Sequence, residues 1–269
     1  MSSQPAFIQV GALADGFAPD SNILPVVQDL SGRTFTLGFA DGSRETLTLL
    51  DGERVRTAAG EHAARVTSIR PGIYFIDFIG GGAGGKPGST SVVIDERLAL
   101  CTVLNGHLPA QAEAHIDALT RVERNLPLTS VTAEFRHGRL VSDGVHAAAE
   151  LHAPTRELIG MRNMYTYSAT ERYEHVYLNE NFYAWQCLAG VEAGLADVDR
   201  CYTIRIAEKL YLFVWCEKIV PTLGVVMIDL ERMKTDGKIF GYQGSNFGAL
   251  SNFPVGAFAQ VLNTTRYPQ

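Results

Sequence analysis

Apolar and polar residues alternate over short runs along most of the chain, and turn sequences separate these runs. Alternation with a period of two residues is typical of strands with one buried face. In the first half, strands are expected at residues 32–39, 44–50, 66–69, 73–79, 90–94, 98–104, 129–135 and 139–142. Turn composition at residues 40–43, at Asp51-Gly52 and at His137-Gly138 predicts hairpins between neighbouring runs.

Three stretches of the first half depart from this pattern. Residues 1–29 are expected to form a leader, and residues 143–157 a connection to the second half. Residues 109–125 have helical spacing instead. One side of that helix is expected to carry Ala112, Ile116, Leu119 and Val122.

The second half repeats the apolar spacing and the turns of the first half in the same order. The matching stretches are 30–39 with 158–167 and 45–51 with 173–179 (offset 128), 73–78 with 210–215 (offset 137), and 92–95 with 226–229 (offset 134). A tandem duplication explains such a repeat most simply. Short antiparallel strands at this spacing favour closed barrels, which leave no sheet edge unpaired.

We therefore predict an all-β fold, made by tandem duplication of a lipocalin-like (calycin) antiparallel β-barrel with few short helices. Residues 1–150 would form an N-terminal barrel with its leader and a degenerate site. Residues 151–269 would form a C-terminal barrel that carries the functional site.

Residues 210–217 carry an acidic side chain on an aromatic strand face. Tyr211, Phe213, Trp215 and Glu217 share one face because successive side chains of a strand alternate in direction. A carboxyl group among aromatic rings is partly removed from water, which raises its pKa. This strand is therefore the first place to look for chemistry.

Composition narrows the class of function. The net charge of −6 argues against binding a nucleic-acid backbone, which needs a basic face. There is no apolar run of the ~18 residues that a membrane helix needs, and the first residues lack signal-peptide features. We expect a cytoplasmic protein that binds neither membranes nor nucleic acid. Four cysteines without C-x-x-C spacing are expected to be buried free thiols: Cys101, Cys187, Cys201 and Cys216.

Several motifs suggest chemistry but lack a required part. The run from Gly80 to Lys86 lacks the Ser or Thr that follows the lysine of a phosphate-binding loop, so a mobile loop between strands is expected. Gly244-Ser-Asn-Phe-Gly248 does not have the spacing of a nucleophilic serine. His137, His146 and His152 are placed on loops and match no zinc pattern. We expect no metal and no cofactor.

Other polar residues of the second half could line a pocket or serve packing alone. Tyr165 and Tyr167 are two apart, so they share one face of one strand, and Arg200 begins a strand predicted at residues 200–206. His175 lies between Tyr173 and Tyr177 and is either a core histidine or a pocket-lining one. Tyrosine, tryptophan and arginine often line barrels for packing alone.

The same residues resemble the bacterial phenolic acid decarboxylases. The similarity rests on the motif Tyr165-Thr-Tyr167, the spacing of Tyr173 and Tyr177, and Arg200 followed by the strand that ends in Glu217. That family consists of small lipocalin-like barrels that act on hydroxycinnamic acids without a cofactor. The resemblance implies that Tyr165, Tyr167 and Arg200 hold a substrate carboxylate and that Glu217 exchanges a proton with the phenolic end. The spacing from Arg200 to Trp215 is shorter than in the family.

About 240 residues also resemble the two-barrel MoaF family, often labelled as molybdenum cofactor biosynthesis proteins. The similar stretches are residues 173–179, 195–200, 217–224 and 248–254. Nothing in these residues indicates pterin or molybdate chemistry, and a link to aromatic amine catabolism is equally compatible with them.

The duplication separates packing residues from polar ones. Tyr211 and Trp215 have aromatic counterparts in Tyr74 and Phe78. Tyr165, Tyr167 and Glu217 instead correspond to Leu37, Phe39 and Gly80. If the polar groups served only the fold, both copies should tend to keep them, so the difference favours a functional pocket in the second barrel.

We therefore predict a cofactor-independent lyase or isomerase that acts by acid/base catalysis on a small aromatic, phenolic substrate in the C-terminal barrel. The expected catalytic residues are Glu217, Tyr165, Tyr167 and Arg200. The expected substrate-binding residues are Trp215, Phe213, Trp185, His175, Tyr177 and Tyr202. The alternatives are a non-catalytic carrier or sensor of the same ligands and an accessory factor in molybdenum cofactor assembly. The N-terminal barrel would act as a built-in partner, and a homodimer of the two-barrel chain remains an option.

Overall fold

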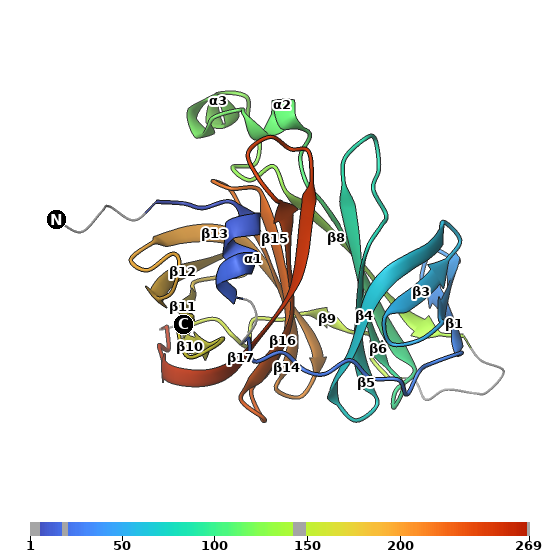
Figure 1. Ribbon diagram of the computed structural model, residues 1–269. Coiled ribbons are helices and arrows are strands. Elements are labelled where there is room, and N and C mark those ends of the chain that lie inside the picture. Colours follow the sequence, from blue (N-terminus) through green and yellow to red (C-terminus); the bar gives the residue numbers. More distant parts are fainter. Residues whose placement is uncertain (1–5, 18–20, 142–148, 268–269) are drawn as a thin grey trace.

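The computed structural model describes residues 6–17, 21–141 and 149–267. Two closed antiparallel barrels of eight strands each lie side by side (Figure 1). The strands of the first barrel are β1 (Thr34–Phe39), β2 (Arg44–Leu49), β3 (Arg54–Thr57), β4 (Gly60–Arg70), β5 (Ile73–Ile79), β6 (Gly88–Asp95), β7 (Leu100–His107) and β8 (Thr132–Leu140). Pairing of β1 with β8 closes this barrel.

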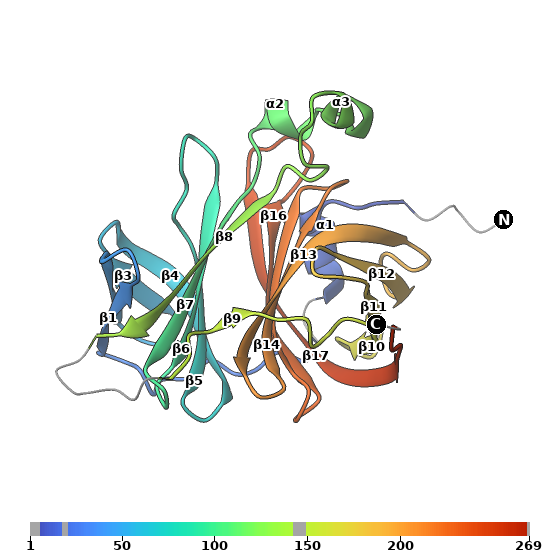
Figure 2. The same ribbon diagram turned by 180° about the vertical axis from the view of Figure 1, so that it is seen from behind.

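The second barrel has the same build. Its strands are β10 (Met161–Thr166), β11 (Arg172–Tyr177), β12 (Phe182–Ala189), β13 (Ala196–Ala207), β14 (Leu210–Glu217), β15 (Thr222–Asp229), β16 (Lys234–Tyr242) and β17 (Leu250–Thr264). Pairing of β12 with β13 closes it. The short strand β9 (Ala153–Pro154) joins the outer edge of β13, where the chain enters the second half (Figure 2).

Strand register confirms the duplication. Leu37 pairs with Glu45 in the first barrel, and Tyr165 pairs with Tyr173 in the second, which keeps the offset of 128 on both strands. Likewise, Phe78 pairs with Thr90 as Trp215 pairs with Gly224. Residues at equivalent positions therefore occupy the same place in the two barrels.

The region after β7 differs from the sequence prediction. Residues 132–140 form the single strand β8, so the hairpin predicted at His137-Gly138 is wrong. The predicted helix is two short ones, α2 (Gln111–Ala114) and α3 (Ala118–Glu123). Leu119 and Val122 are exposed, whereas Arg121 is buried and donates to three backbone carbonyls. Residues 142–148, with His146 and the first part of the predicted connection, lie outside the described residues.

The two barrels share an apolar interface, as the hypothesis of a built-in partner requires. Outward-facing residues of β4 to β8, among them Phe75 and Leu104, pack with outward-facing residues of β13 to β16, among them Leu212 and Phe240. Buried ion pairs also cross the interface. Arg65 binds Asp236 at 2.8 Å, and Arg70 binds Asp229 at 2.7 Å.

The leader belongs physically to the second barrel. Helix α1 (Val10–Phe17) buries Val10, Leu13 and Phe17 in the core of that barrel. The backbone N–H of Gly11 donates to the carbonyl of Gln243 at 3.1 Å. Helix α1 contacts β16 and β17, and Figure 1 shows it against the second barrel. The chain then returns to the first barrel, and the N-terminal segment thus contributes a helix to the C-terminal barrel.

No helix in residues 6–17, 21–141 or 149–267 is long and apolar enough to span a bilayer. The four cysteines are free and buried, as predicted.

Candidate functional site

Large aromatic side chains fill the inside of the second barrel. They come from alternate positions of β10, β11, β12 and β14, because the inward face of each strand holds every second residue. The inward aromatic residues are Tyr165, Tyr167, Tyr173, Tyr177, Tyr183, Trp185, Tyr211, Phe213 and Trp215. The barrel therefore has an interior filled largely by aromatic rings.

A small cavity of about 30 Å³ remains at one end of this interior. That volume has room for a few water molecules at most and is too small for an aromatic ring. Its lining residues are Leu13, Phe17, Tyr167, Tyr173, His175, Tyr183, Trp185, Glu192, Trp215, Glu217 and Ile239. Helix α1 closes it, because the ring of Phe17 packs 4.9 Å from that of Tyr167 and 5.8 Å from that of Tyr173. An aromatic ligand fits only after α1 moves.

Glu217 sits at the end of β14 and lines this cavity. Its carboxylate oxygen Oε1 accepts a hydrogen bond from the indole Nε1 of Trp215 at 2.9 Å. Removal from water raises the pKa of Glu217 well above its ordinary value, and the negative charges of Asp199 and Glu192 raise it further. The acidic group expected from the sequence is therefore present.

Glu192 is a second carboxyl group in the lining, and the sequence argument missed it. It lies in the turn between β12 and β13, and the hydroxyl of Tyr173 donates to its Oε2 at 3.0 Å. Burial raises the pKa of Glu192 as well. Turn residues carry no periodic signal, so only the fold could bring Glu192 toward Glu217.

Asp199, on β13, is a third buried carboxyl group, and its charge acts on Glu217. Its Oδ2 accepts from the indole Nε1 of Trp185 at 2.8 Å, and its Oδ1 accepts from the backbone N–H of Lys218 at 3.1 Å. Burial raises the pKa of Asp199. Each of the two tryptophans of the barrel thus donates its indole N–H to a carboxylate, which orients both acids. Asp199 lies within the similar stretch 195–200, but the sequence argument gave it no role.

Tyr165 and Tyr167, the tyrosines of the implied carboxylate clamp, both point into the barrel, but only one of them reaches the cavity. Tyr167 lines the cavity with Glu217. Tyr165 lies outside the lining, and its hydroxyl is 2.6 Å from that of Tyr177 and receives a bond from Asn163 at 3.2 Å. Burial raises the pKa of Tyr165 to about 12. Tyr165 and Tyr177 therefore form a buried pair beneath the cavity.

His175 lies among aromatic rings and also reaches the cavity. Its ring centroid is 4.8 Å from that of Tyr165 and 5.0 Å from that of Tyr183. Burial lowers its pKa to about 3, so the imidazole is neutral at neutral pH. Both predicted roles apply, since His175 is a core residue and a lining one. Phe213 is fully buried and, like Tyr177, lies outside the lining.

Arg200 and Tyr202 lie outside the barrel, which corrects their expected placement. Strand alternation places Asp199 and Cys201 inside and therefore turns Arg200 and Tyr202 outward. The guanidinium of Arg200 lies 4.7 Å from the Tyr202 ring centroid and donates to Asn181. Arg200 therefore does not join Tyr165 and Tyr167, so the three-residue clamp implied by the decarboxylase resemblance does not form among them.

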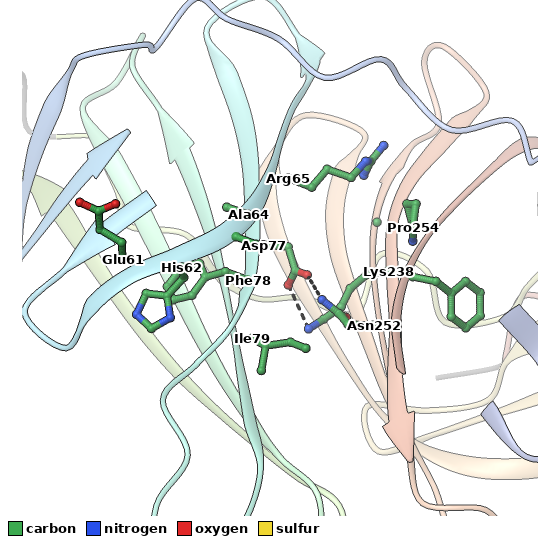
Figure 3. A pocket seen from close by; sticks show the side chains of 13 residues that line it. Glu61, His62, Ala64, Arg65, Asp77, Phe78, Ile79, Lys238, Asn252 and Pro254 are labelled. Carbon is green, nitrogen blue, oxygen red and sulfur yellow. Dashed lines mark hydrogen bonds and ion pairs between the residues drawn. The ribbon is translucent and has the colours of Figure 1, made fainter. Parts of the chain in front are cut away.

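A separate cleft of about 490 Å³ lies between the barrels, beside β4, β5, β16 and β17 (Figure 3). Lys238 of the second barrel pairs there with Asp77 of the first at 2.9 Å, and the side-chain amide of Asn252 donates to Asp77 at 2.8 Å. The lysine and the aspartate are both buried and neutralise one another. We assign this cluster to holding the barrels together.

The chemistry of the C-terminal cavity follows from its lining. It combines aromatic rings, two carboxyl groups with raised pKa values and one neutral imidazole. The lining includes no lysine or arginine. Among the described residues, no group of three or more His, Cys, Asp and Glu side chains is arranged to hold a metal ion. The site can thus donate and accept protons, and its walls would contact an aromatic ring once α1 has moved.

Comparison with known proteins matches each half of the chain to a family model. Residues 5–110 match the model described as the MoaF N-terminal domain, and residues 152–265 match the MoaF C-terminal domain. The chain is also 50% identical over 270 residues to Protein MoaF of Klebsiella aerogenes, with 100% of both chains covered.

Proposed function

The chain belongs to the MoaF family, and from this premise we propose that its C-terminal barrel binds a small phenolic molecule and exchanges protons with it through Glu217. The observation that carries the proposal is the placement of the Glu217 carboxyl at an aromatic cavity, hydrogen-bonded by Trp215 and with a raised pKa. Enzymes use such a carboxylic acid, kept protonated near neutral pH by its surroundings, as a general acid.

The acidic groups that line the cavity determine which ligand charge the site can accept. Glu192 and Glu217 face the cavity, and the nearest sequence candidate for a counter-charge, Arg200, lies outside the barrel. A ligand carboxylate would be buried beside these acidic groups with no lysine or arginine in the lining to balance its charge, which is costly in a buried site. The ligand is therefore a neutral or cationic phenolic molecule, such as a phenolic alcohol or amine. Decarboxylation of a hydroxycinnamate fits this lining poorly.

The reaction class is a lyase or an isomerase that needs only proton transfers. With one proton held between the two carboxyl groups, Glu217 donates it to one atom of the ligand and Glu192 accepts a proton from another. The two carboxyl groups influence each other electrostatically, so one of them carries the proton more readily than the other. A positioned acid or base of this kind contributes typically about 10²–10⁴-fold in rate.

Ligand entry requires helix α1 to move. Leu13 and Phe17 fill the end of the barrel where a ring would enter beside Glu217. A helix of eight residues whose contacts are with one barrel end can move without unfolding either barrel. Closure of α1 over the ligand would then exclude water from the site.

A non-catalytic carrier is the second candidate, and the same closed cavity favours it. Burial of a ligand beneath α1 serves transport or sensing as well as catalysis. An accessory role in molybdenum cofactor assembly remains a further prediction, and pterin absorbance in the purified protein would support it.

The test compares wild type with Glu217→Gln on phenolic alcohols and amines, with ligand binding and turnover measured separately. Catalysis through Glu217 predicts that the variant binds ligand but loses turnover. Full turnover in a folded variant would overturn this mechanism. Binding without turnover in both proteins would favour the carrier.

A further inference from the structure

An open cavity of about 630 Å³ extends from the surface into the first barrel, whereas the corresponding end of the second barrel holds about 30 Å³. Small-molecule sites in proteins typically measure ~300–1,000 Å³. The cavity is lined by inward residues of the first barrel core, including Leu37, Phe78, Val92 and Val103. It is therefore a space inside the barrel that continues to the surface.

Smaller side chains at the duplicated positions create this space. Leu37 stands where the second barrel has Tyr165, Leu47 where it has His175, and Phe78 where it has Trp215. Helix α1 closes only the second barrel. The first barrel consequently keeps an open interior that needs no lid movement.

The glycine run between β5 and β6 leaves the mouth of the cavity open. Gly80 is equivalent to Glu217, and Gly81 lines the cavity. Gly81 has φ of 76°, and a Cβ there would come within 2.9 Å of the Thr90 hydroxyl. Any other residue would be strained and would crowd the mouth. The run thus has a physical role even though it is not a phosphate-binding loop.

The barrel wall is also open on one side of the cavity. β2 pairs with β3 only through Thr48 with Arg56 and Leu49 with Val55. Before Thr48, strand β2 separates from β3, and residues 44–48 line the cavity along this opening. An elongated ligand can therefore enter through the wall.

The chemistry of the lining is amphipathic, with an apolar floor and a basic rim. Arg44 and Arg56 line the rim, and Arg56 is paired with the exposed carboxylate of Glu61. Glu45 of the rim is bound by Arg136, which lies over the Phe39 ring at 3.6 Å. The three arginines and two glutamates sum to one positive charge. This net positive charge is opposite in sign to the charge of the acidic groups that line the C-terminal cavity.

Polar groups inside the cavity can also receive a head group. The hydroxyl of Thr90 donates to the side-chain oxygen of Asn105 at 3.0 Å. This bond uses the side-chain oxygen of Asn105 and not its amide N–H groups, and Asn105 lines the cavity. The His62 ring is tilted against that of Phe78, with 5.0 Å between centroids, and it shares a polar contact of 3.2 Å with the Thr57 hydroxyl.

We propose that the N-terminal barrel is a second ligand site, specific for an amphipathic monocarboxylate. Its apolar chain lies among Leu37, Phe78 and Val103, and its carboxylate lies at Arg44. This site does not depend on the function proposed for the C-terminal barrel. The chain then binds two ligands of opposite electrostatic preference, one in each barrel.

The test uses the full-length chain and displacement of the fluorescent amphiphile 1-anilinonaphthalene-8-sulfonate. The competitors are decanoate, decanol and decylamine, which share a chain and differ in head-group charge. Decanoate should displace the probe best and decylamine worst. Arg44→Glu should weaken decanoate by about three- to fivefold, as expected for one partly exposed charge pair, and leave decanol unchanged. Arg200→Glu, outside both cavities, is the matched charge control.

A second variant tests the location. Val103→Trp places an indole in the cavity and should abolish displacement by decanoate in a protein that keeps its circular dichroism spectrum. Equal competition by decanoate and decylamine, or unchanged binding in folded Val103→Trp, would overturn the proposal. If Val103→Trp does not fold, Arg44→Glu decides alone, because Arg44 is exposed and its replacement leaves the core intact.

Discussion

Trp215 and Glu217 lie two residues apart on the same face of β14, and the indole N–H donates to the carboxylate at 2.9 Å. This bond opposes the rise in the pKa of Glu217, but burial and the neighbouring acids outweigh it. Trp185 and Asp199 form the same kind of pair at 2.8 Å. The end of the barrel is thus built from tryptophans that hold carboxyl groups, and it is closed by a helix from the start of the chain.

Helix α1 should control access to this end of the barrel. Phe17→Ala removes a ring that is 3% exposed, so it should destabilise the docked helix, by up to about 3–5 kcal/mol, and enlarge the cavity. Affinity for 4-hydroxybenzyl alcohol should rise because less of the helix must be displaced. Calorimetric titration and urea unfolding measure both effects. Leu119→Ala, in exposed α3, is the control and should change neither. Lower affinity in Phe17→Ala would contradict a closing role for α1.

Arg200 should have no part in holding the ligand of the C-terminal barrel. It points outward over Tyr202, so Arg200→Ala is expected to leave the affinity for 4-hydroxybenzyl alcohol unchanged. The same titration with 4-hydroxybenzoate should show weak binding in both proteins, because the cavity lining is acidic. Tight benzoate binding that Arg200→Ala abolishes would restore the clamp implied by the decarboxylase resemblance.

The duplication made much of the fold predictable. Equivalent strands kept their spacing, and β11, predicted only through its match to residues 45–51, has the same length and register as β2. Alternation also correctly placed Glu217 and Tyr167 inside. Alternation assigns a side chain to a face only when another residue of the same strand is known to be buried, and no such residue was known for the strand of Arg200. The sequence does not show whether the odd-numbered or the even-numbered residues of β13 face inward, and so it does not show that Asp199 takes an inward position.

Long-range contacts set the remaining features. Leu13 and Phe17 have an ordinary amphipathic spacing, and nothing local indicates that they cover the second barrel instead of the first. Glu192 lies in an irregular turn. The apolar side expected for residues 109–125 is exposed because Arg121, bonded to three carbonyls, takes the buried position.

His175 should make the protein less stable in mild acid. Its folded pKa of about 3 lies below the ordinary value of 6.5, so the unfolded chain binds a proton that the folded chain does not. Stability is therefore full above pH 6.5 and is lost as pH falls toward 3. At pH 5.0 the loss should be about 2 kcal/mol relative to pH 7.5.

Urea unfolding of wild type and His175→Phe at the two pH values isolates this contribution, because all other groups are shared. The difference in free energy of unfolding between the two proteins should change by about 2 kcal/mol in favour of the variant when the pH is lowered to 5.0. His115→Phe, at an exposed site, should show no such shift. An unchanged difference for His175→Phe would mean that the imidazole titrates normally.

The buried pair of Lys238 and Asp77 should hold the two barrels together. Lys238→Met leaves the Asp77 carboxylate buried without its cation and should cost about 3–5 kcal/mol in urea unfolding. Adding Asp77→Asn should recover part of this cost. Arg56→Met, which breaks an exposed pair with Glu61, should cost less than about 1 kcal/mol. Equal effects of the two single variants would contradict a structural role for the buried pair.

The protonation state of Glu217 tests the central claim most directly. Carbon-13 NMR of glutamate-labelled protein, with Glu217→Gln to assign the resonance, follows this carboxyl group through a pH titration with and without 4-hydroxybenzyl alcohol. The account predicts a carboxyl that is still protonated at neutral pH and whose resonance shifts when the phenolic ligand binds. A carboxyl that titrates near its ordinary pKa of 4.5, or that does not respond to the bound ligand, would contradict it.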